Sequence, residues 1–132
     1  MVEAGVRYFK DDVILYRYAD VLLMKAEAKN ALGQDPSAEI NQVRQRAYGT
    51  AFAQHTFVSG SKEQNDDAIL QERLLELAFE GKRWWDLVRF NKAFDLVPSL
   101  QNRKGQNHLL LFPISSYILS LEPQIQQNAG YN

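Results

Sequence analysis

The chain has 132 residues, 45% of them hydrophobic and 11% aromatic, which is enough for one packed domain and excludes a disordered chain. Fifteen Lys and Arg face sixteen Asp and Glu, and this formal net charge of −1 argues against a nucleic-acid binder, which needs a basic excess on one face. The absence of Cys excludes disulfides and thiolate chemistry, and no apolar run approaches the roughly 18 residues that a bilayer-spanning helix needs.

The first strong helix candidate lies in residues 14–33, ILYRYADVLLMKAEAKNALG, which are rich in Ala, Leu, Met, Lys and Glu. We expect the helix to begin near Arg17, and Gly33 stands where a left-handed C-terminal cap belongs. Asp35 and Pro36 then predict the start of a second helix that ends at about Tyr48. Because so few residues separate the two helices, they should form an antiparallel hairpin.

This hairpin carries a partial repeat signal. Ala26, Gly33 and Ala38 fall where a tetratricopeptide unit places its small residues. The unit's later small position falls on Gln45, and no second copy follows at an offset of about 34 residues. A true repeat unit and an ordinary closely packed hairpin therefore both remain open.

Further along the chain, Gly-, Ser- and Gln-rich residues 49–65 predict a long mobile loop. A third helix is expected from about Asp66 to Glu80, where Gly81 stops it. A fourth is expected from about Arg83 to Phe94.

The last part of the chain is less regular. LLLF (109–112) is expected to be extended, Ser115 should cap a short helix that ends at about Leu121, and Pro123 begins an irregular tail. The expected fold is mainly α, with helical hairpins of tetratricopeptide-like type, a long loop and an irregular C-terminal tail. Residues 1–132 are expected to be a single domain or a fragment of one.

Charge and aromatic residues concentrate in residues 71–91, QERLLELAFEGKRWWDLVRFN. Glu72, Glu76 and Glu80 align at i, i+4 and i+8 on the expected third helix, where like charges repel by a few tenths of a kcal/mol per pair. We therefore expect cationic partners, and Arg83 and Arg89 are the nearest candidates.

Three interpretations of this segment compete. A carboxylate pair could act as the acid and base of a glycosidase, which need about 5 to 10 Å between them. Trp85 with Arg89 could form a stacking platform for sugars. The favoured interpretation is structural: Glu–Arg ion pairs join two helices across Gly81. Neither catalytic residues nor cofactors are predicted.

The two adjacent tryptophans should differ in burial. The helical period places Trp84 in the core and Trp85 on the opposite flank, beside Arg89. A Trp there needs a cover, which could be the tail or helices upstream of residue 1. We expect the tail, residues 123–132, to bury Trp85.

Two further residue sets are candidate sites. Glu27 interrupts an apolar run and should pair with Arg44, or with Arg46, across the hairpin, although a Glu that simply faces water is the alternative. His55 and His108 lie far apart in expected loops without the local spacing of metal ligands, so no metal site is predicted. No dinucleotide, phosphate-loop or nucleophile-elbow motif occurs.

The stretch ERLLELAFEGKRWWDLVRFN resembles the signature of the SusD/RagB family, which reads ER–x–x–ELAFEG–x–RWxDLxR. YRYADVLLMKAEAKNALG, INQVRQRAYG and the closing LFPISSYILSLEPQIQQNAGYN resemble further family segments in the same order. The resemblance spans residues 14–132. Departures from the family pattern, such as Leu74, Ser115, Glu122 and Ala129, affect local turns.

The resemblance implies a glycan- or nutrient-binding lipoprotein of the bacterial outer membrane rather than an enzyme. Such proteins work with a SusC-like TonB-dependent transporter in oligosaccharide uptake. Family members run to several hundred residues, so we expect this chain to be a C-terminal scaffold fragment, anchored through a lipid-bearing N-terminal region absent from it. The oligosaccharide would be bound mainly by regions absent here, and no ligand residue is assigned.

One alternative function class stays open. A tetratricopeptide-like protein–protein interaction module without glycan binding would share the hairpin and the lack of catalytic residues. It would not need the closing QNAGY tail.

Overall fold

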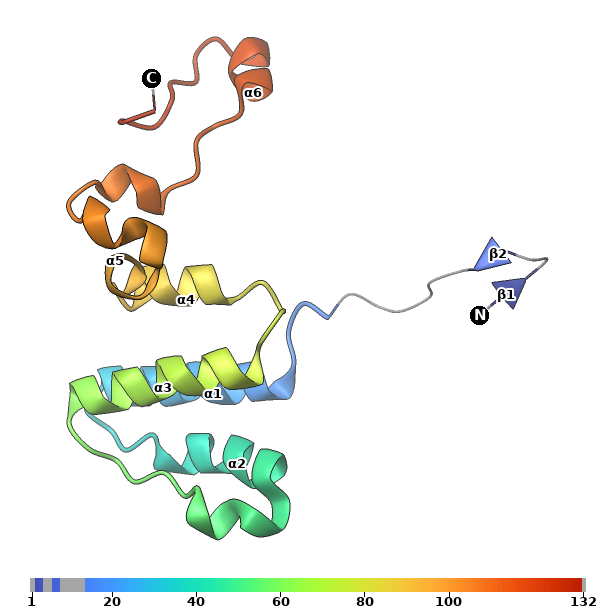
Figure 1. The fold of residues 1–132 in the computed structure, drawn as a ribbon, viewed down its shortest axis with the longest axis vertical. Helices are drawn as coiled ribbons and strands as arrows, with labels where there is room; N and C mark the ends of the chain where they lie inside the picture. The colour runs from blue at the N-terminus through green and yellow to red at the C-terminus, as the bar shows by residue number, and fades with distance from the viewer. Residues whose placement is uncertain (1, 4–5, 8–13, 132) are drawn as a thin grey trace. The chain divides into compact units, whose positions relative to one another are not determined.

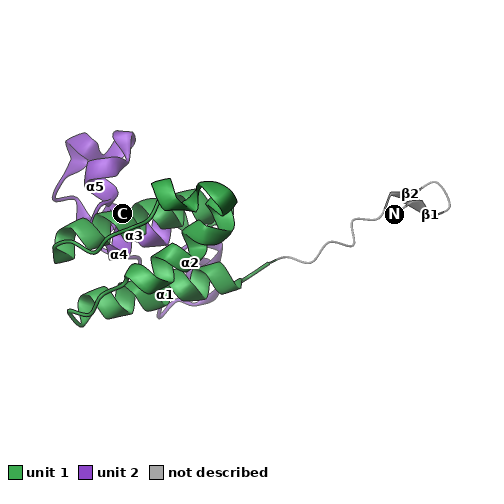
Figure 2. Cartoon of the chain, turned by 90° about the horizontal axis from the view of Figure 1, so that it is seen from below, with its two compact units in different colours: residues 1–83 green, residues 84–132 purple. Residues whose placement is uncertain are grey.

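The computed structural model describes residues 2–3, 6–7 and 14–131 (Figure 1). The expected fold class is confirmed: apart from the antiparallel pair β1 (Val2–Glu3) and β2 (Val6–Arg7), the described elements are helical. The chain divides into two compact units, residues 1–83 and 84–132 (Figure 2). The sequence did not foresee this division, and whether the chain is one domain or a fragment stays a prediction.

The first unit contains α1 (Tyr18–Ala31), α2 (Ser37–Tyr48) and α3 (Lys62–Glu76). Helix α1 packs against both of the others, and α1 and α2 form the predicted hairpin (Figures 1 and 2). Its apolar cluster joins Leu22 and Leu23 of α1 to Val43 of α2 and to Leu77. Burial of each such side chain contributes about 1.5–3 kcal/mol.

The end of α1 follows from one glycine, as predicted. Gly33 has φ +70°, a conformation that glycine adopts without strain. Its N–H donates to the carbonyl of Asn30 at 3.1 Å, and the N–H of Gln34 donates to the carbonyl of Lys29 at 2.8 Å. These two bonds are the Schellman motif, and they turn the chain toward α2.

The predicted third helix was misplaced at both ends. Helix α3 begins at Lys62 because Ser61 and Gln64 form a capping box, in which the Ser61 hydroxyl accepts from the Gln64 N–H and the Gln64 side chain accepts from the Ser61 N–H. The expected loop 49–65 therefore contains the first turn of α3 and a 3₁₀ helix, η1 (Gly49–Gln54).

At its other end, α3 stops at Glu76 and not at Glu80. The residues that follow form a turn in which Phe79 has φ +64° and Gly81 has φ +71°, both in the left-handed region. Glu80 therefore lies outside the helix, and the expected ladder of three aligned carboxylates is reduced to Glu72 and Glu76.

Helix α4 (Arg83–Arg89) begins at the last residue of the first unit. The predicted fourth helix was too long, because the chain turns at Asn91, which has φ +56°. The remaining elements are α5 (Ala93–Leu96), η2 (Pro98–Arg103), η3 (Asn107–Leu110) and α6 (Ser116–Leu121). The first half of LLLF is thus 3₁₀-helical rather than extended. The Ser115 cap of α6 is confirmed, since its hydroxyl accepts from the Ile118 N–H at 3.3 Å.

The prediction that the tail buries Trp85 is wrong. Trp85 is 55% exposed, and its ring meets the edge of Phe112 at 5.8 Å between centroids. The tail instead binds the segment before α6: the Gln127 amide bonds both backbone groups of Ile114 at 2.8 Å, and the Tyr131 hydroxyl donates to the carbonyl of Leu111. Trp84, expected in the core, is half-buried.

Candidate functional site

The charged residues that attracted attention in the sequence form ion pairs across the first unit. Glu72 is buried, and its carboxylate accepts from Arg44 Nε of α2 at 2.8 Å. Arg44 also donates to the carbonyl of His55 at 3.0 Å, and its guanidinium lies over the Phe57 ring. This pair ties α2 to α3 and to the segment that follows η1.

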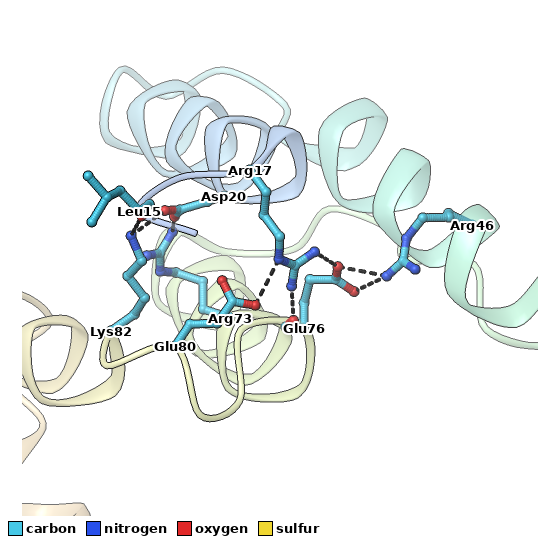
Figure 3. A network of polar contacts seen from close by, with 8 residues as sticks. All are labelled: Leu15, Arg17, Asp20, Arg46, Arg73, Glu76, Glu80 and Lys82. Atoms are coloured by element: carbon cyan, nitrogen blue, oxygen red, sulfur yellow. Dashed lines mark hydrogen bonds and ion pairs between the residues drawn. The ribbon is translucent and has the colours of Figure 1, made fainter. Parts of the chain in front are cut away.

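Glu76 is the centre of a second set of contacts, shown in Figure 3. Its carboxylate binds Arg17, which precedes α1, and both of its oxygens accept from Arg46 Nη2 of α2 at 2.6 Å. Arg17 also donates to the backbone carbonyl of Glu76 and, through Nε, to Glu80 at 2.8 Å. One carboxylate at the end of α3 therefore joins the start of α1 to α2.

A third set lies beside it and is more deeply buried. Asp20 of α1 is 1% exposed and meets Arg73 of α3 at 2.9 Å and Lys82 at 3.0 Å. Lys82 also donates to the carbonyl of Leu15 at 2.6 Å (Figure 3). Its ammonium lies over the Tyr16 ring. These contacts fasten the segment entering α1 to the turn that leaves α3. We call these three sets together the charged joint. Its residues are Arg17, Asp20, Arg44, Arg46, Glu72, Arg73, Glu76, Glu80 and Lys82.

Ion pairing favours the charged form of Arg17 in the charged joint and of Glu39 elsewhere in the first unit. Desolvation lowers the pKa of Arg17, but its hydrogen bonds to Glu76 and Glu80 outweigh this, so its pKa is raised. Elsewhere on the hairpin, desolvation raises the pKa of Glu39, but contacts with Lys29 at 2.8 Å and Lys25 at 2.9 Å outweigh it and leave that pKa lowered.

The structure gives the carboxylates partners that the sequence analysis did not name. Glu76 and Glu80 bind Arg17, whereas the predicted partner Arg83 donates to the carbonyl of Leu70 at 3.0 Å. The other candidate, Arg89, binds Asp86 at 2.9 Å. Pairing of Arg83 or Arg89 with the three glutamates stays a prediction.

The same holds for the predicted hairpin pair. Arg44 binds Glu72, and Arg46 binds Glu76. Glu27 is half-buried on α1, and its pairing with either arginine stays a prediction.

The residues of the charged joint to which the sequence analysis gave no ion-pair role are Arg17, Asp20, Arg73 and Lys82. A usable signal existed for one of them, because Asp20 is an acidic residue inside an apolar helix, as Glu27 is. A buried carboxylate requires a cation nearby.

This arrangement suits a structural role better than acid catalysis. An acid catalyst needs a carboxyl group that a substrate can reach. Both oxygens of Glu76 accept hydrogen bonds from Arg46, and Glu72 accepts from Arg44.

Other kinds of site find no support in the described part of the chain. No group of three or more acidic or histidine side chains there is arranged to hold a metal ion. His55 stacks on Tyr48 at 3.8 Å, and His108 meets the edge of the Tyr131 ring at 5.4 Å. None of the helices within the described ranges is both long and apolar enough to cross a bilayer.

Comparison with known proteins agrees with the resemblance seen in the sequence. The model of the SusD family matches residues 3–104. SusD-like protein P38 of Formosa agariphila is 40% identical over 126 residues, which are 91% of this chain and 25% of that protein. The starch-binding protein SusD of Bacteroides thetaiotaomicron is 29% identical over 94% of this chain and 22% of its own length.

A solved structure, B. fragilis NanU, superposes with a TM-score of 0.73 and 39% identity over 98% of this chain and 29% of that one. The chain thus spans about a quarter of the length of the curated relatives that it matches. The family match includes all three helices of the first unit and the charged joint between them. The chain belongs to the SusD family.

Proposed function

We propose that this chain is the C-terminal scaffold part of a glycan-binding outer-membrane lipoprotein that works with a SusC-like TonB-dependent transporter in oligosaccharide uptake. The observation that supports this most strongly is the family match over residues 3–104. One relative bears the name starch-binding protein, so oligosaccharides are the proposed ligand class. The lipid anchor and most ligand contacts would belong to the part of the longer protein outside this chain.

The role proposed for the described residues is to support the binding part, not to catalyse a reaction. The charged joint fastens three helices and the segment entering α1 to one another through ion pairs. Its carboxylates are occupied by arginine and lysine side chains, which suits a rigid support. Reaction chemistry would need a carboxylate or nucleophile available to a substrate.

The test uses the full-length product of the gene that encodes these residues. We expect the purified protein to bind at least one oligosaccharide in a calorimetric titration against a glycan panel, without releasing reducing ends. We also expect a tagged copy in detergent-solubilised outer membranes to copurify a TonB-dependent barrel. Release of reducing ends that is lost in a Glu76→Gln variant would overturn the non-enzymatic role, and failure to bind any glycan would overturn the ligand class.

The alternative is a protein-interaction module without glycan binding. The exposed apolar residues along α1 favour a protein contact of some kind. Copurification of a barrel by a protein that binds no glycan on the panel would support this alternative.

A further inference from the structure

A polar pocket opens where α1 ends and α3 begins, and we call it the polar pocket. Its volume is about 430 Å³, within the range of about 300–1,000 Å³ that small-molecule sites occupy. The residues that line it fall between Asn30 and Asn65, so the pocket lies wholly within the first unit. Their side chains carry carboxamide, hydroxyl, carboxylate and ammonium groups, and none of them is aromatic. The polar pocket lies apart from the charged joint, because the two share no residue.

The most deeply buried residues of the pocket lining are two asparagines. Asn30 of α1 and Asn65 of α3 are 3% and 4% exposed, and the Asn65 amide donates to Asn30 Oδ1 at 3.0 Å. The Asn30 amide donates in turn to the carbonyl of Lys62 at 2.9 Å. Asn65 Oδ1 accepts from the N–H of Gly60 at 2.8 Å. These bonds fix α1, α3 and the segment before α3 to one another, so this part of the pocket is preorganised for a ligand.

The exposed residues of the lining have hydrogen-bonding groups to spare. The Gln34 side chain is exposed, and no hydrogen bond joins it to another of the described residues. The Lys62 ammonium donates to Asp66 at 2.7 Å, which uses one of its three N–H groups. Asp35 is also exposed, and hydrogen bonds from the side chain and the backbone N–H of Ser37 hold its pKa below the ordinary value. The pocket therefore offers a ligand a carboxamide, an ammonium and an ionised carboxylate.

The chemistry of the lining selects a neutral ligand that is rich in hydroxyl groups. Net charge does not select the ligand, because the charges of Asp35 and Lys62 are opposite in sign. An apolar ligand would find no aromatic or large aliphatic side chain to pack against among these residues. A hydroxyl group both donates and accepts. Several neighbouring hydroxyls can therefore satisfy the carboxylate, the carboxamide and the ammonium at the same time.

We propose that the polar pocket binds one sugar ring, whose hydroxyl groups hydrogen-bond to Gln34, Asp35 and Lys62. A free monosaccharide and the end ring of a longer glycan present the same hydroxyls, so both are expected to enter. This site goes beyond the proposed function, which leaves most ligand contacts to the part of the longer protein outside this chain. It would give the first unit a sugar contact of its own.

Calorimetric titration of the full-length protein with glucose, galactose, mannose and N-acetylglucosamine tests the proposal. We expect at least one of them to bind in the millimolar range, because a ligand of that size makes few contacts. Gln34→Ala should weaken this binding about fivefold or more, the effect of losing one hydrogen bond. Asp35→Asn should weaken it similarly, although Asn keeps an oxygen for the Ser37 N–H.

A matched control separates the pocket from the rest of α3. Gln71→Ala changes an exposed residue of α3 outside the pocket lining and should leave the affinity unchanged. Gln34 and Asp35 are exposed as well, so all three variants should keep the urea midpoint of the parent.

Two outcomes would overturn the proposal. Failure of all four monosaccharides to bind would mean that the pocket is no site for a sugar ring. Binding that is equally strong in the parent, Gln34→Ala and Asp35→Asn would place the sugar at another part of the protein. Oligosaccharide binding on the glycan panel is measured in parallel, so that either outcome with intact panel binding refutes this inference and leaves the proposed function standing.

Discussion

Replacing Glu76 by Ala removes the carboxylate at the centre of the charged joint. Glu76 has a side chain that is 6% exposed, and it binds Arg17, which is 28% exposed, and Arg46, which is 66% exposed. A hydrogen bond to a charged group contributes about 1.5–3 kcal/mol, whereas an exposed ion pair contributes about 0–1 kcal/mol. Arg17 keeps Glu80 and the backbone carbonyl of residue 76 as partners. We therefore expect Glu76→Ala to lower the free energy of unfolding by about 2–4 kcal/mol.

The assay is urea unfolding followed by far-ultraviolet circular dichroism, which reports the helices. Two variants serve as controls. Arg46→Ala should cost less than about 1 kcal/mol because its side chain is mostly exposed. Glu63→Gln, an exposed change in the first turn of the same helix, should cost less than about 1 kcal/mol through the helix dipole. A Glu76→Ala effect no larger than that of either control would mean that the contacts of Glu76 do not stabilise the first unit.

Three further predictions follow from single contacts. Because the pKa of Glu39 is lowered in the folded protein, ionised Glu39 stabilises the fold above its unfolded pKa of about 4.5, and this contribution is lost as pH falls through the lower folded pKa. Acid unfolding curves of the parent and of Glu39→Gln should therefore converge at low pH. Parallel curves would contradict this. Ser61→Ala should cost about 1 kcal/mol by removing the capping box of α3, and an unchanged urea midpoint would count against the cap. A double-mutant cycle on Arg44 and Glu72 should give a coupling energy above about 0.5 kcal/mol, larger than the coupling energy of Arg44 with Glu27. A larger coupling energy for Arg44 with Glu27 would favour the pairing inferred from the sequence.

Local signals explain what the sequence predicted well. Gly33 ends α1 and Ser115 starts α6, because each acts through backbone groups a few residues away. The start of α3 was missed although its signal is local too. The capping pattern of Ser61 and Gln64 lies inside a polar stretch whose composition is typical of a loop.

The end of α3 could not be predicted in the same way. Leu77 continues the helical period, yet it turns into the core cluster with Leu22, Leu23 and Val43. Phe79, which has a backbone conformation that costs a non-glycine residue about 1–2 kcal/mol, follows in the turn. Tertiary packing therefore overrides the local preference for helix.

The partners of the charged residues depend on distant parts of the chain. Arg17 and Glu76 are 59 positions apart, and no period within one helix can select such a pair. The sequence could show that Glu72 and Glu76 need cations, because like charges one turn apart repel. It could not show that the cations come from the segment before α1 and from α2, which depends on how three helices pack.

We propose that the charged joint supports the fold and does not contact the proposed oligosaccharide ligand. The most direct test is a pair of measurements on one full-length variant, Glu76→Gln: the free energy of unfolding and the dissociation constant for the best glycan found on the panel. We expect the variant to lose about 1.5–3 kcal/mol of stability and to keep a dissociation constant within about twofold of the parent, since a twofold change corresponds to only about 0.4 kcal/mol. Unchanged stability together with an affinity lowered by about tenfold or more, equivalent to about 1.4 kcal/mol, would mean that Glu76 acts in binding and not in support of the fold.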